Sequence, residues 1–319
     1  FKSDPKFLKN NEVPKKRLEE LKNQRSEYLA HEYFNKDWLP AYFSEVEGVL
    51  ADAKLSYACS ANFLDHIAAI NHTQEQQKYL NTIPDTSLRE TARDFLVNQS
   101  FRRDYWIKGP VKLGPFEKLA RIRSQRFIYS HQKVKLPISV KGALGEAKLL
   151  DKIYSPILNL MEDYQIRTFE EIEQALGSAA PNSQRLIEAI LILCGANILS
   201  PAQCEKDIGL ASQSTDALNK KILDQVLIDG PVKFLASPVT GGGIYVGNLE
   251  KMFILATREG LEGAPSLVNY AKKIMQSLNQ TMLRDGKPVP NDQVLNELSA
   301  RVAEFETASL PLLRALKIV

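Results

Sequence analysis

The sequence predicts a mainly α-helical protein with small β elements, divided into two domains. Apolar residues recur at helical spacing along most of the chain, whereas runs rich in aromatic and β-branched residues are few and short. The length of 319 residues favours two hydrophobic cores over one. We expect a helical domain over residues 1–145 and a winged-helix-like domain over residues 146–319, which ends in a helical extension.

The first domain is expected to begin with a polar lead-in over residues 1–14, which contains prolines at both ends. Helices are predicted from Lys15, over residues 41–53, near Leu80 before Pro84, and from Asp85 to about Tyr105. The last of these begins with Ser87 and Glu90 at capping-box spacing, in which each side chain satisfies a backbone amide. Its expected buried stripe consists of Leu88, Ala92, Phe95 and Leu96.

The following segments are predicted to change from strand to helix and back. Residues 126–136 are rich in aromatic and β-branched residues and are expected to form a strand or an extended crossover. Residues 141–145 then close the first domain. Four helices are then predicted: 148–164, 168–177, one that begins at Asn182 or Ser183, and 214–227. Two strands are predicted at 232–236 and 243–246. The chain is expected to end with two helices, around 267–283 and 292–313. Three short helices followed by a hairpin is the order of a winged helix.

The overall charge and the cysteine content restrict the functional classes. A formal net charge of +3 is small for this length and gives no case for general attraction to nucleic acid or membranes. Three scattered cysteines do not form a disulfide framework, so we expect a reducing, cytoplasmic setting. No apolar run approaches the roughly 18 residues that a membrane span needs. Because the chain starts at Phe1, we expect it to be a piece of a longer protein.

One candidate site is the helix face formed by Tyr28, His31 and Glu32. Their i, i+3, i+4 spacing places the three side chains on the same side of a helix. A histidine beside a carboxylate can hold one tautomer and position a substrate group. The same residues can also form a local hydrogen-bond cluster that joins helices, and the pattern by itself favours this structural role.

A second candidate is the polar row of Asp94, Asn98 and Arg102, with Phe101 beside it. In a continuous helix these residues lie at i, i+4 and i+8, away from the apolar stripe. The Arg102 guanidinium can form two parallel hydrogen bonds to a carboxylate. We expect the row to be structural, either within the domain or at an interface with another domain, and not catalytic.

The basic residues suggest a nucleic-acid alternative. Such residues neutralise phosphates and aromatic residues stack on bases, but the same pattern fits a solvated strand face or an edge that meets an acidic protein. The basic group consists of Lys118, Arg121, Arg123, Arg126, Lys133 and Lys135, with Phe127 and Tyr129 between them. The predicted recognition helix at 214–227 has two lysines and two aspartates but no arginine, so it does not suit the major groove. Nucleic acid is therefore the less favoured partner, and the winged-helix-like domain is expected to contact protein.

No metal or phosphate site is expected. His66 and His72 are six residues apart and lack the cysteine or carboxylate pattern of a zinc site. The glycines at 241–243 do not open a helix, and the neighbouring residues 237–240 favour a hairpin turn over a phosphate loop.

Two stretches at this separation carry a family resemblance, namely Tyr28-Leu-Ala-His-Glu-Tyr-Phe34 and Asp94-Phe-Leu-Val-Asn-Gln-Ser-Phe-Arg102. Together they resemble the methyltransferase regulatory domain of bacterial S-adenosylmethionine-dependent methyltransferases, including protein lysine methyltransferases. The resemblance implies a region that positions the substrate, or regulates access to it, beside a cofactor-binding domain that precedes it. It also implies that the helix of Tyr28, His31 and Glu32 borders the acceptor pocket, and that the winged-helix-like half is similar to the C-terminal part of those enzymes.

The chain departs from such an enzyme because it lacks the acidic, glycine-rich loop after a strand that binds the cofactor. The expected function is therefore a non-catalytic regulatory or substrate-positioning region, with no catalytic, cofactor-binding or metal-binding residues of its own and with S-adenosylmethionine in the parent enzyme. Its expected partners are the missing cofactor-binding domain and a protein substrate, with a homodimer as a further option. The alternative is a winged-helix adaptor that binds nucleic acid or protein.

Overall fold

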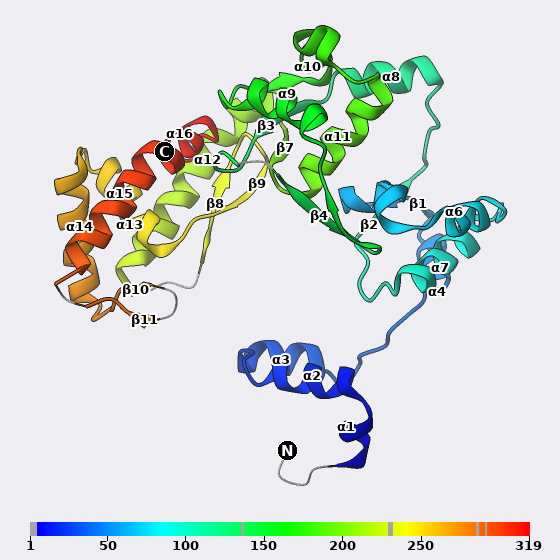
Figure 1. The fold of residues 1–319 in the computed structure, drawn as a ribbon, viewed down its shortest axis with the longest axis horizontal. Coiled ribbons are helices and arrows are strands. Elements are labelled where there is room, and N and C mark those ends of the chain that lie inside the picture. The colour runs from blue at the N-terminus through cyan, green and yellow to red at the C-terminus, as the bar shows by residue number, and fades with distance from the viewer. Residues whose placement is uncertain (1–4, 135–136, 229–231, 285–286, 291) are drawn as a thin grey trace.

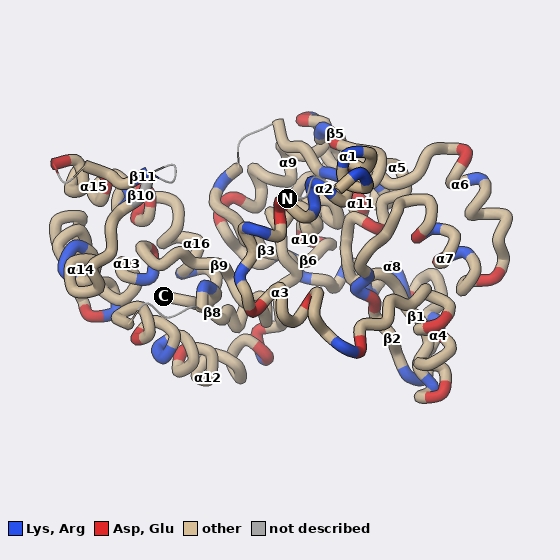
Figure 2. Tube along the Cα trace, turned by 90° about the horizontal axis from the view of Figure 1, so that it is seen from below, with Lys and Arg blue, Asp and Glu red and all other residues tan. Residues whose placement is uncertain are grey.

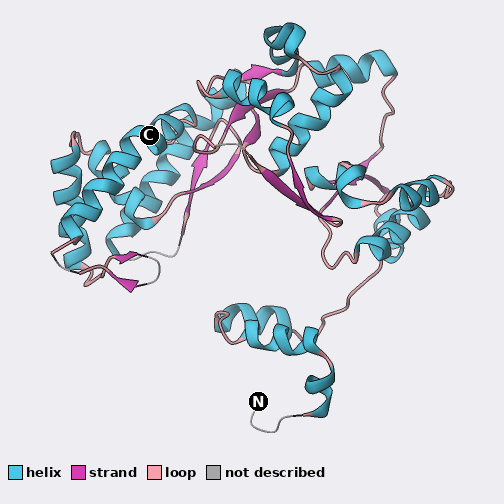
Figure 3. Cartoon of the chain, viewed as in Figure 1, coloured by secondary structure: helices cyan, strands magenta, loops and turns pink. Residues whose placement is uncertain are grey.

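The computed structural model describes residues 5–134, 137–228, 232–284, 287–290 and 292–319. Most of these residues lie in helices, and the strands are short and paired antiparallel (Figure 1; Figure 3). The predicted fold class is confirmed to this extent: the protein is mainly α-helical with small β elements. Among the described residues, no helix combines the length and the apolar character that crossing a bilayer requires.

The N-terminal helices lie apart from the rest of the molecule (Figure 1). They are α1 (Lys6–Asn10), α2 (Glu12–Leu21) and α3 (Ser26–Tyr33). Helix α1 and the start of α2 fall inside the predicted lead-in at 1–14, so this prediction is wrong, although residues 1–4 lie outside the described residues. The prediction rested on Pro14 as a sign that no helix had begun. Proline is tolerated in the first turn of a helix, however, because the N–H that it lacks has no helical partner there.

The next part combines a two-stranded sheet with surrounding helices. Its elements are α4 (Phe43–Asp52), β1 (Leu55–Ser60), the 3-10 helix η1 (Phe63–His66), α5 (Ala68–Asn71), α6 (Gln74–Asn81), α7 (Thr86–Val97) and β2 (Asp104–Lys108). The two strands pair antiparallel from Leu55 opposite Lys108 to Ser60 opposite Asp104, with one irregularity in β1. The predicted helices at 41–53 and near Leu80 correspond to α4 and α6.

Helix α7 begins with a cap that differs from the predicted one. The Asp85 carboxylate accepts a hydrogen bond from the Leu88 amide at 2.7 Å. The predicted capping box of Ser87 with Glu90 is therefore wrong, because Ser87 already lies inside the helix.

The end and the outer face of α7 also differ from the prediction. The helix ends at Val97, because Asn98 adopts a left-handed conformation (φ 53°), and residues 104–108 form β2 instead of further helix. Leu88 and Phe95, which were predicted to be buried, are 59% and 68% exposed. This face of α7 thus points to solvent.

The middle of the chain is built on a three-stranded antiparallel sheet with strand order β6-β3-β7. Its elements are α8 (Pro115–Arg123), β3 (Arg126–Tyr129), β4 (Ser139–Gly142), β5 (Gly145–Lys148), α9 (Asp151–Met161), β6 (Arg167–Thr168), α10 (Phe169–Leu176), η2 (Gly177–Ala179), α11 (Ser183–Gly195) and β7 (Leu199–Ala202). The predicted capping box of Thr168 with Glu171 is confirmed, because each side chain bonds the other residue's amide, at 2.7 and 3.1 Å. Asn182 caps α11, as one of the two predicted alternatives.

The C-terminal part is a layer of helices with two hairpins. Its elements are α12 (Glu205–Asp224), η3 (Gln225–Ile228), β8 (Phe234–Ser237), β9 (Gly242–Tyr245), α13 (Asn248–Arg258), α14 (Ala264–Ser277), β10 (Leu283–Arg284), β11 (Lys287–Pro288), α15 (Val294–Glu304), the π-helical turn η4 (Phe305–Ser309) and α16 (Leu310–Ala315). The predicted β8–β9 hairpin is confirmed. Helix α13 was not predicted from the sequence, and its residues 251–256 are all buried.

The winged-helix arrangement is not confirmed. Helices α10 and α11 pack in one hydrophobic core around Tyr129, whereas α12 and the β8–β9 hairpin pack in a second core around Phe253. A winged helix would bury its helices and its hairpin together. The first core also takes in Ile67 and Leu158, from both sides of residue 145. The division into domains 1–145 and 146–319 stays a prediction.

Two close backbone contacts hold the first part of the chain against the middle part. Gly142 in the β4–β5 hairpin lies against α5, where a Cβ would be 2.3 Å from the Ile70 carbonyl oxygen. The Leu144 amide donates to this same oxygen at 3.0 Å. On α11, a Cβ at Gly195 would be 2.6 Å from the Leu64 side chain. Position 142 therefore requires glycine for close approach of two backbone segments, whereas a Cβ at Gly195 would have to displace the Leu64 side chain.

Candidate functional site

Helix α3 carries the first candidate residues, Tyr28, His31 and Glu32, and all three are exposed. Tyr28 packs edge-on against Tyr33 with ring centroids 6.4 Å apart. Arg17 of α2 donates a hydrogen bond to the Tyr33 hydroxyl at 2.6 Å, which joins the two helices. Within the described ranges, neither His31 nor Glu32 forms a hydrogen bond or an ion pair. These two side chains are thus open to a partner.

Arg102 is the centre of the second candidate group. Its guanidinium lies among three carboxylates, with Nη1 2.7 Å from Asp94, Nη2 2.9 Å from Glu90 and Nε 2.8 Å from Asp104. The Arg102 side chain is 17% exposed, and the three carboxylate side chains are between 8% and 20% exposed. Water and salt therefore screen these ion pairs only weakly. We name these four residues the Arg102 charge cluster.

The predicted polar row on one continuous helix is wrong, because α7 ends before the row is complete. Asn98 is the left-handed C-cap of α7, and its amide bonds the Asp94 and Phe95 carbonyls. The chain then reverses, so that Arg102 reaches Asp94 from the following loop and not from the next turns of a helix. Phe101 is 76% exposed in that loop. The pairing of Arg102 with Asp94 exists, but the turn creates it.

Aromatic rings complete the surroundings of the guanidinium, and none of them was predicted from the sequence. The Phe43 ring centroid lies 4.4 Å from the Arg102 Cζ, within cation–π range, and the Tyr57 centroid lies 5.6 Å from it. Trp106 stacks on Phe43 with centroids 5.5 Å apart. Arg102 therefore joins α4, β1, α7 and β2. The sequence feature that could have indicated this site is the side-chain alternation along β2, which places Asp104 and Trp106 on the same face of the strand.

The charge cluster shifts the proton equilibria of its members. Burial raises the pKa of Glu90, but the Arg102 hydrogen bond and the Arg93 charge outweigh burial and leave this pKa below its ordinary value. Burial raises the pKa of Asp94 despite the nearby guanidinium. Burial, and then the Glu90 charge, raises the pKa of Tyr57, whose hydroxyl stays protonated and donates to Glu90 at 3.1 Å. In the part of the chain that the structure describes, no group of three or more His, Cys, Asp or Glu side chains is placed to hold a metal ion.

Large apolar side chains are exposed around α7 and the segment before α4. They are between 58% and 87% exposed, although residues of these types are ordinarily buried. Two of them, Tyr42 and Phe95, lie together with ring centroids 5.7 Å apart. We name them the exposed apolar set: Phe34, Trp38, Leu39, Tyr42, Phe95 and Phe101. Exposed apolar residues that gather in a patch mark interaction surfaces, and Tyr42 with Phe95 forms such a contact within the set.

Two of the basic residues of the middle part are paired with carboxylates. Arg123 pairs with Glu173 at 3.1 Å and Lys133 with Glu162 at 3.4 Å. Tyr129 is fully buried and cannot stack on a base. Figure 2 shows basic and acidic residues scattered over the whole trace. Lys135, which was part of the predicted group, lies outside the described residues.

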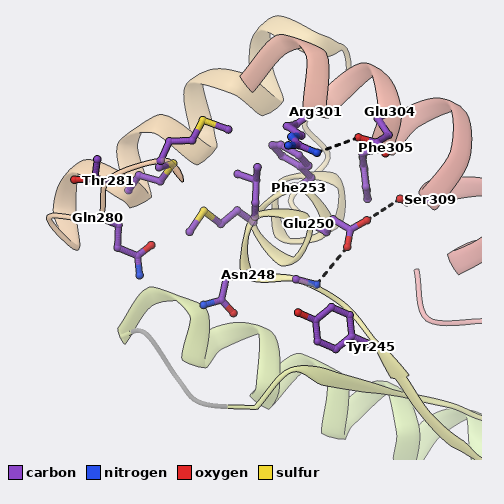
Figure 4. A pocket seen from close by; sticks show the side chains of 15 residues that line it. Tyr245, Asn248, Glu250, Phe253, Gln280, Thr281, Arg301, Glu304, Phe305 and Ser309 are labelled. Atoms are coloured by element: carbon purple, nitrogen blue, oxygen red, sulfur yellow. Dashed lines mark hydrogen bonds and ion pairs between the residues drawn. The ribbon is translucent and has the colours of Figure 1, made fainter. Parts of the chain in front are cut away.

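A pocket of about 760 Å³ lies among the C-terminal helices, and no sequence motif indicated it (Figure 4). Its walls come from three separate stretches of the chain, which include α13, α14, and α15 with the directly following η4. The Glu250 carboxylate faces its interior, where it accepts hydrogen bonds from the Ser309 hydroxyl at 2.7 Å and the Gly247 amide at 3.3 Å. Arg301 and Glu304 form an ion pair at 3.5 Å on another wall.

Comparison with known proteins supports the resemblance drawn from the two motifs. The family described as "Predicted methyltransferase regulatory domain" matches residues 25–108, from the N-cap of α3 to the end of β2. An uncharacterized protein of Synechocystis sp., sll1526, is 32% identical over 319 residues, which are 100% of this chain and 62% of that protein. This match extends through the middle and C-terminal parts.

Solved structures of PKMT2 from Rickettsia typhi share the fold. The structure in complex with AdoHcy gives a TM-score of 0.58 at 14% identity and covers 100% of this chain and 65% of its own. A second PKMT2 structure gives 0.55 at 13% identity and covers 96% of this chain and 64% of its own. This chain therefore spans less than two thirds of the length of each relative. Both motifs lie inside residues 25–108, and it is this stretch of the chain that matches the methyltransferase regulatory domain.

Proposed function

We propose that this chain is the non-catalytic region of an S-adenosylmethionine-dependent methyltransferase. In this function it positions a protein lysine side chain for methyl transfer by a separate cofactor-binding domain. The regulatory-domain match and the fold shared with PKMT2 support the proposal. The observation that carries it is the exposed apolar set of the regulatory domain.

The exposed apolar set has the character of a docking surface for another domain. Covering a large apolar side chain contributes roughly 1.5–3 kcal/mol, so six such residues can hold two domains together after the cost of ordering them. All six lie in the matched range 25–108. More than a third of each relative lies outside the region that this chain matches, which is room for a further domain. We propose that the cofactor-binding domain covers this surface.

The described residues do not themselves fit the methyl donor. Nucleotide-type cofactors bind beyond the carboxyl ends of parallel strands, where a glycine-rich turn meets a helix. Every strand pair among the described residues is antiparallel. We therefore assign these residues to orientation of the acceptor and to exclusion of water, and not to cofactor binding.

The α3 face is our candidate for the acceptor side. An amine accepts a methyl group only when its nitrogen is held in line with the transferred group and water is excluded. Tyr28, His31 and Glu32 are exposed on α3, and the last two have no partner in the described ranges. They can orient a lysine side chain of a protein substrate. The cytoplasmic setting, the homodimer and the winged-helix-like contact with protein stay predictions.

The experiment compares variants of the full-length protein that contains this region. We expect Phe95→Ser with Phe101→Ser to lower methyl transfer to a lysine-containing protein by about tenfold or more, because the domains no longer dock. Binding of S-adenosylmethionine, measured by calorimetry, is expected to change little. His31→Ala is likewise expected to lower the rate of methyl transfer and to leave the affinity for S-adenosylmethionine nearly unchanged.

The matched control is Leu210→Ser on α12, which is 73% exposed and lies outside the regulatory domain. It is expected to leave transfer unchanged. Normal transfer by the Phe95 and Phe101 double variant would show that the exposed apolar set does not dock a catalytic domain.

A further inference from the structure

We propose that the pocket of Figure 4 binds a primary alkylammonium group, supplied by a lysine side chain of a polypeptide. The pocket lies outside the regulatory domain and is formed by this chain alone. The proposal therefore stands independently of methyl transfer. Three features carry it, namely an uncompensated carboxylate, apolar walls and a preformed shape.

The carboxylate of Glu250 is held in place but not neutralised. Its two hydrogen-bond donors, the Ser309 hydroxyl and the Gly247 amide, are both neutral. No cation among the described residues pairs with it. The other charges of the pocket do not compensate, because Arg301 already faces two carboxylates, Glu304 at 3.5 Å and Glu297 at 3.3 Å. The pocket is thus electrostatically complementary to a cation.

The remaining walls suit an aliphatic stem. Three of the four methionines of the chain, Met252, Met275 and Met282, line the pocket together with the rings of Phe253 and Phe305. Methionine side chains adapt their shape to apolar ligands, and a lysine stem packs on apolar surface while its ammonium group stays with polar groups.

The shape of the pocket is fixed by an unusual backbone turn. Residues 305–309 form the π-helical turn η4, which places Ser309 against Glu250. Ser309 is 4% exposed and also accepts a hydrogen bond from Gln132 at 2.9 Å, which anchors it to the loop after β3. Isolated π-helical turns are rare and frequent at functional sites. A volume of about 760 Å³ lies within the range of ligand pockets and exceeds one side chain, so a short peptide segment fits.

The test uses this chain with its methionine methyl groups labelled with carbon-13. The probes are a capped Leu-Lys-Leu peptide, the same peptide with Nε-acetyl-lysine, and free pentylamine. We expect the lysine peptide to shift the signals of Met252, Met275 and Met282 and to leave Met161 unmoved, because Met161 lies in the other core. The acetylated peptide is expected to bind about tenfold more weakly or worse, since it lacks the charge.

Two variants and a control locate the binding charge. Glu250→Gln removes the charge at nearly constant shape and is expected to weaken the lysine peptide by about tenfold or more. Glu304→Gln, which leaves Glu250 and its two donors in place, is expected to weaken it to a smaller degree. Glu262→Gln, exposed outside the pocket, serves as the control and should bind like the parent chain.

Equal binding of the acetylated and unmodified peptides would overturn the proposal, as would normal binding by a folded Glu250→Gln variant. Tighter binding of free pentylamine than of the peptide would replace the polypeptide source by a free amine. Because no catalytic domain or methyl donor is present, loss of methyl transfer in the full-length protein would have no bearing on this result.

Discussion

Arg102 connects most of the elements of the regulatory domain through a single side chain. Its guanidinium contacts Glu90 and Asp94 of α7 and Asp104 of β2, and it lies over the Phe43 ring of α4. A planar group with five donors can satisfy this geometry, whereas an ammonium group cannot reach all three carboxylates. The Arg102 charge is thus fully paired inside the domain, where three carboxylates surround it.

Replacing Arg102 is expected to destabilise the fold strongly. Arg102→Ala leaves three partly buried carboxylates without their shared cation, at a cost of about 3–5 kcal/mol in the free energy of unfolding. Arg102→Lys keeps the charge but loses the fork geometry and is expected to lose less. Urea denaturation measures both. Arg25→Ala, which removes a pair that is 77% and 66% exposed, should change little, and an equal loss there would refute a special role for Arg102.

His72 is expected to make stability depend on pH. Its side chain is 5% exposed, its Nδ1 has no hydrogen-bond partner among the described residues, and burial and then the Arg93 charge lower its pKa below 6.5. The unfolded chain therefore binds the proton more readily. The free energy of unfolding should fall as pH drops below 6.5, by at most about 1.4 kcal/mol per pH unit.

Thermal melts between pH 7.5 and 5.5 measure this dependence, in a range above the ordinary pKa of carboxylates. His72→Gln is expected to flatten the slope, and His31→Gln, on the exposed face of α3, is expected to keep it. An unchanged slope in His72→Gln would assign the pH dependence to other groups.

At the scale of elements, two helix caps were predicted correctly, whereas the predicted Ser87–Glu90 capping box was wrong because Asp85 caps α7 instead. Thr168 with Glu171 and the Asn182 cap both occur as predicted, because a cap depends only on residues within one helical turn. The end of α7 was not predictable in the same way. Asn98 ends the helix in a left-handed conformation. The chain reversal that follows is stabilised by the ion pair that Arg102 forms with Asp94. That stabilisation depends on a residue beyond the helix.

The close contact between the β4–β5 hairpin and α5 can be tested with a glycine pair. A Cβ at Gly142 would meet the Ile70 carbonyl oxygen at 2.3 Å, so the backbone must move, and Gly142→Ala is expected to cost about 1–3 kcal/mol in the free energy of unfolding. Gly48 lies inside α4, where a Cβ would have no such neighbour within 4 Å, and Gly48→Ala is expected to stabilise by about 0.5–1 kcal/mol. Destabilisation of both to the same extent would contradict the steric argument.

At the scale of the whole molecule, local patterns predicted the helical class and the β8–β9 hairpin but not the way the parts pack. The helices predicted for one winged helix divide between two cores, and this division depends on which faces meet in space. The same limit applies to the candidate sites, because a pattern in the sequence indicates only residues that lie close together along the chain. Each of the two motifs of the regulatory domain is a contiguous stretch and was found, whereas the pocket around Glu250 draws on three separate stretches and was not.

The regulatory domain separates charge from apolar surface. Its strongest ion pairs lie partly buried around Arg102, while Phe95 and Phe101 face outward. A small isolated domain ordinarily covers large rings such as those of Phe95 and Phe101. A domain of this kind is suited to a permanent neighbour, which is the basis of the proposed function.

The fluorescence of the two tryptophans can be used to follow docking and unfolding of this protein. Trp38 is 63% exposed in the connection between α3 and α4, and Trp106 is stacked on Phe43 beside the guanidinium. Indole fluorescence moves to shorter wavelength when the ring leaves water. The emission of Trp38 therefore follows coverage of the outer surface, and that of Trp106 follows melting of the interior, so the two events can be watched separately after one tryptophan is replaced by phenylalanine.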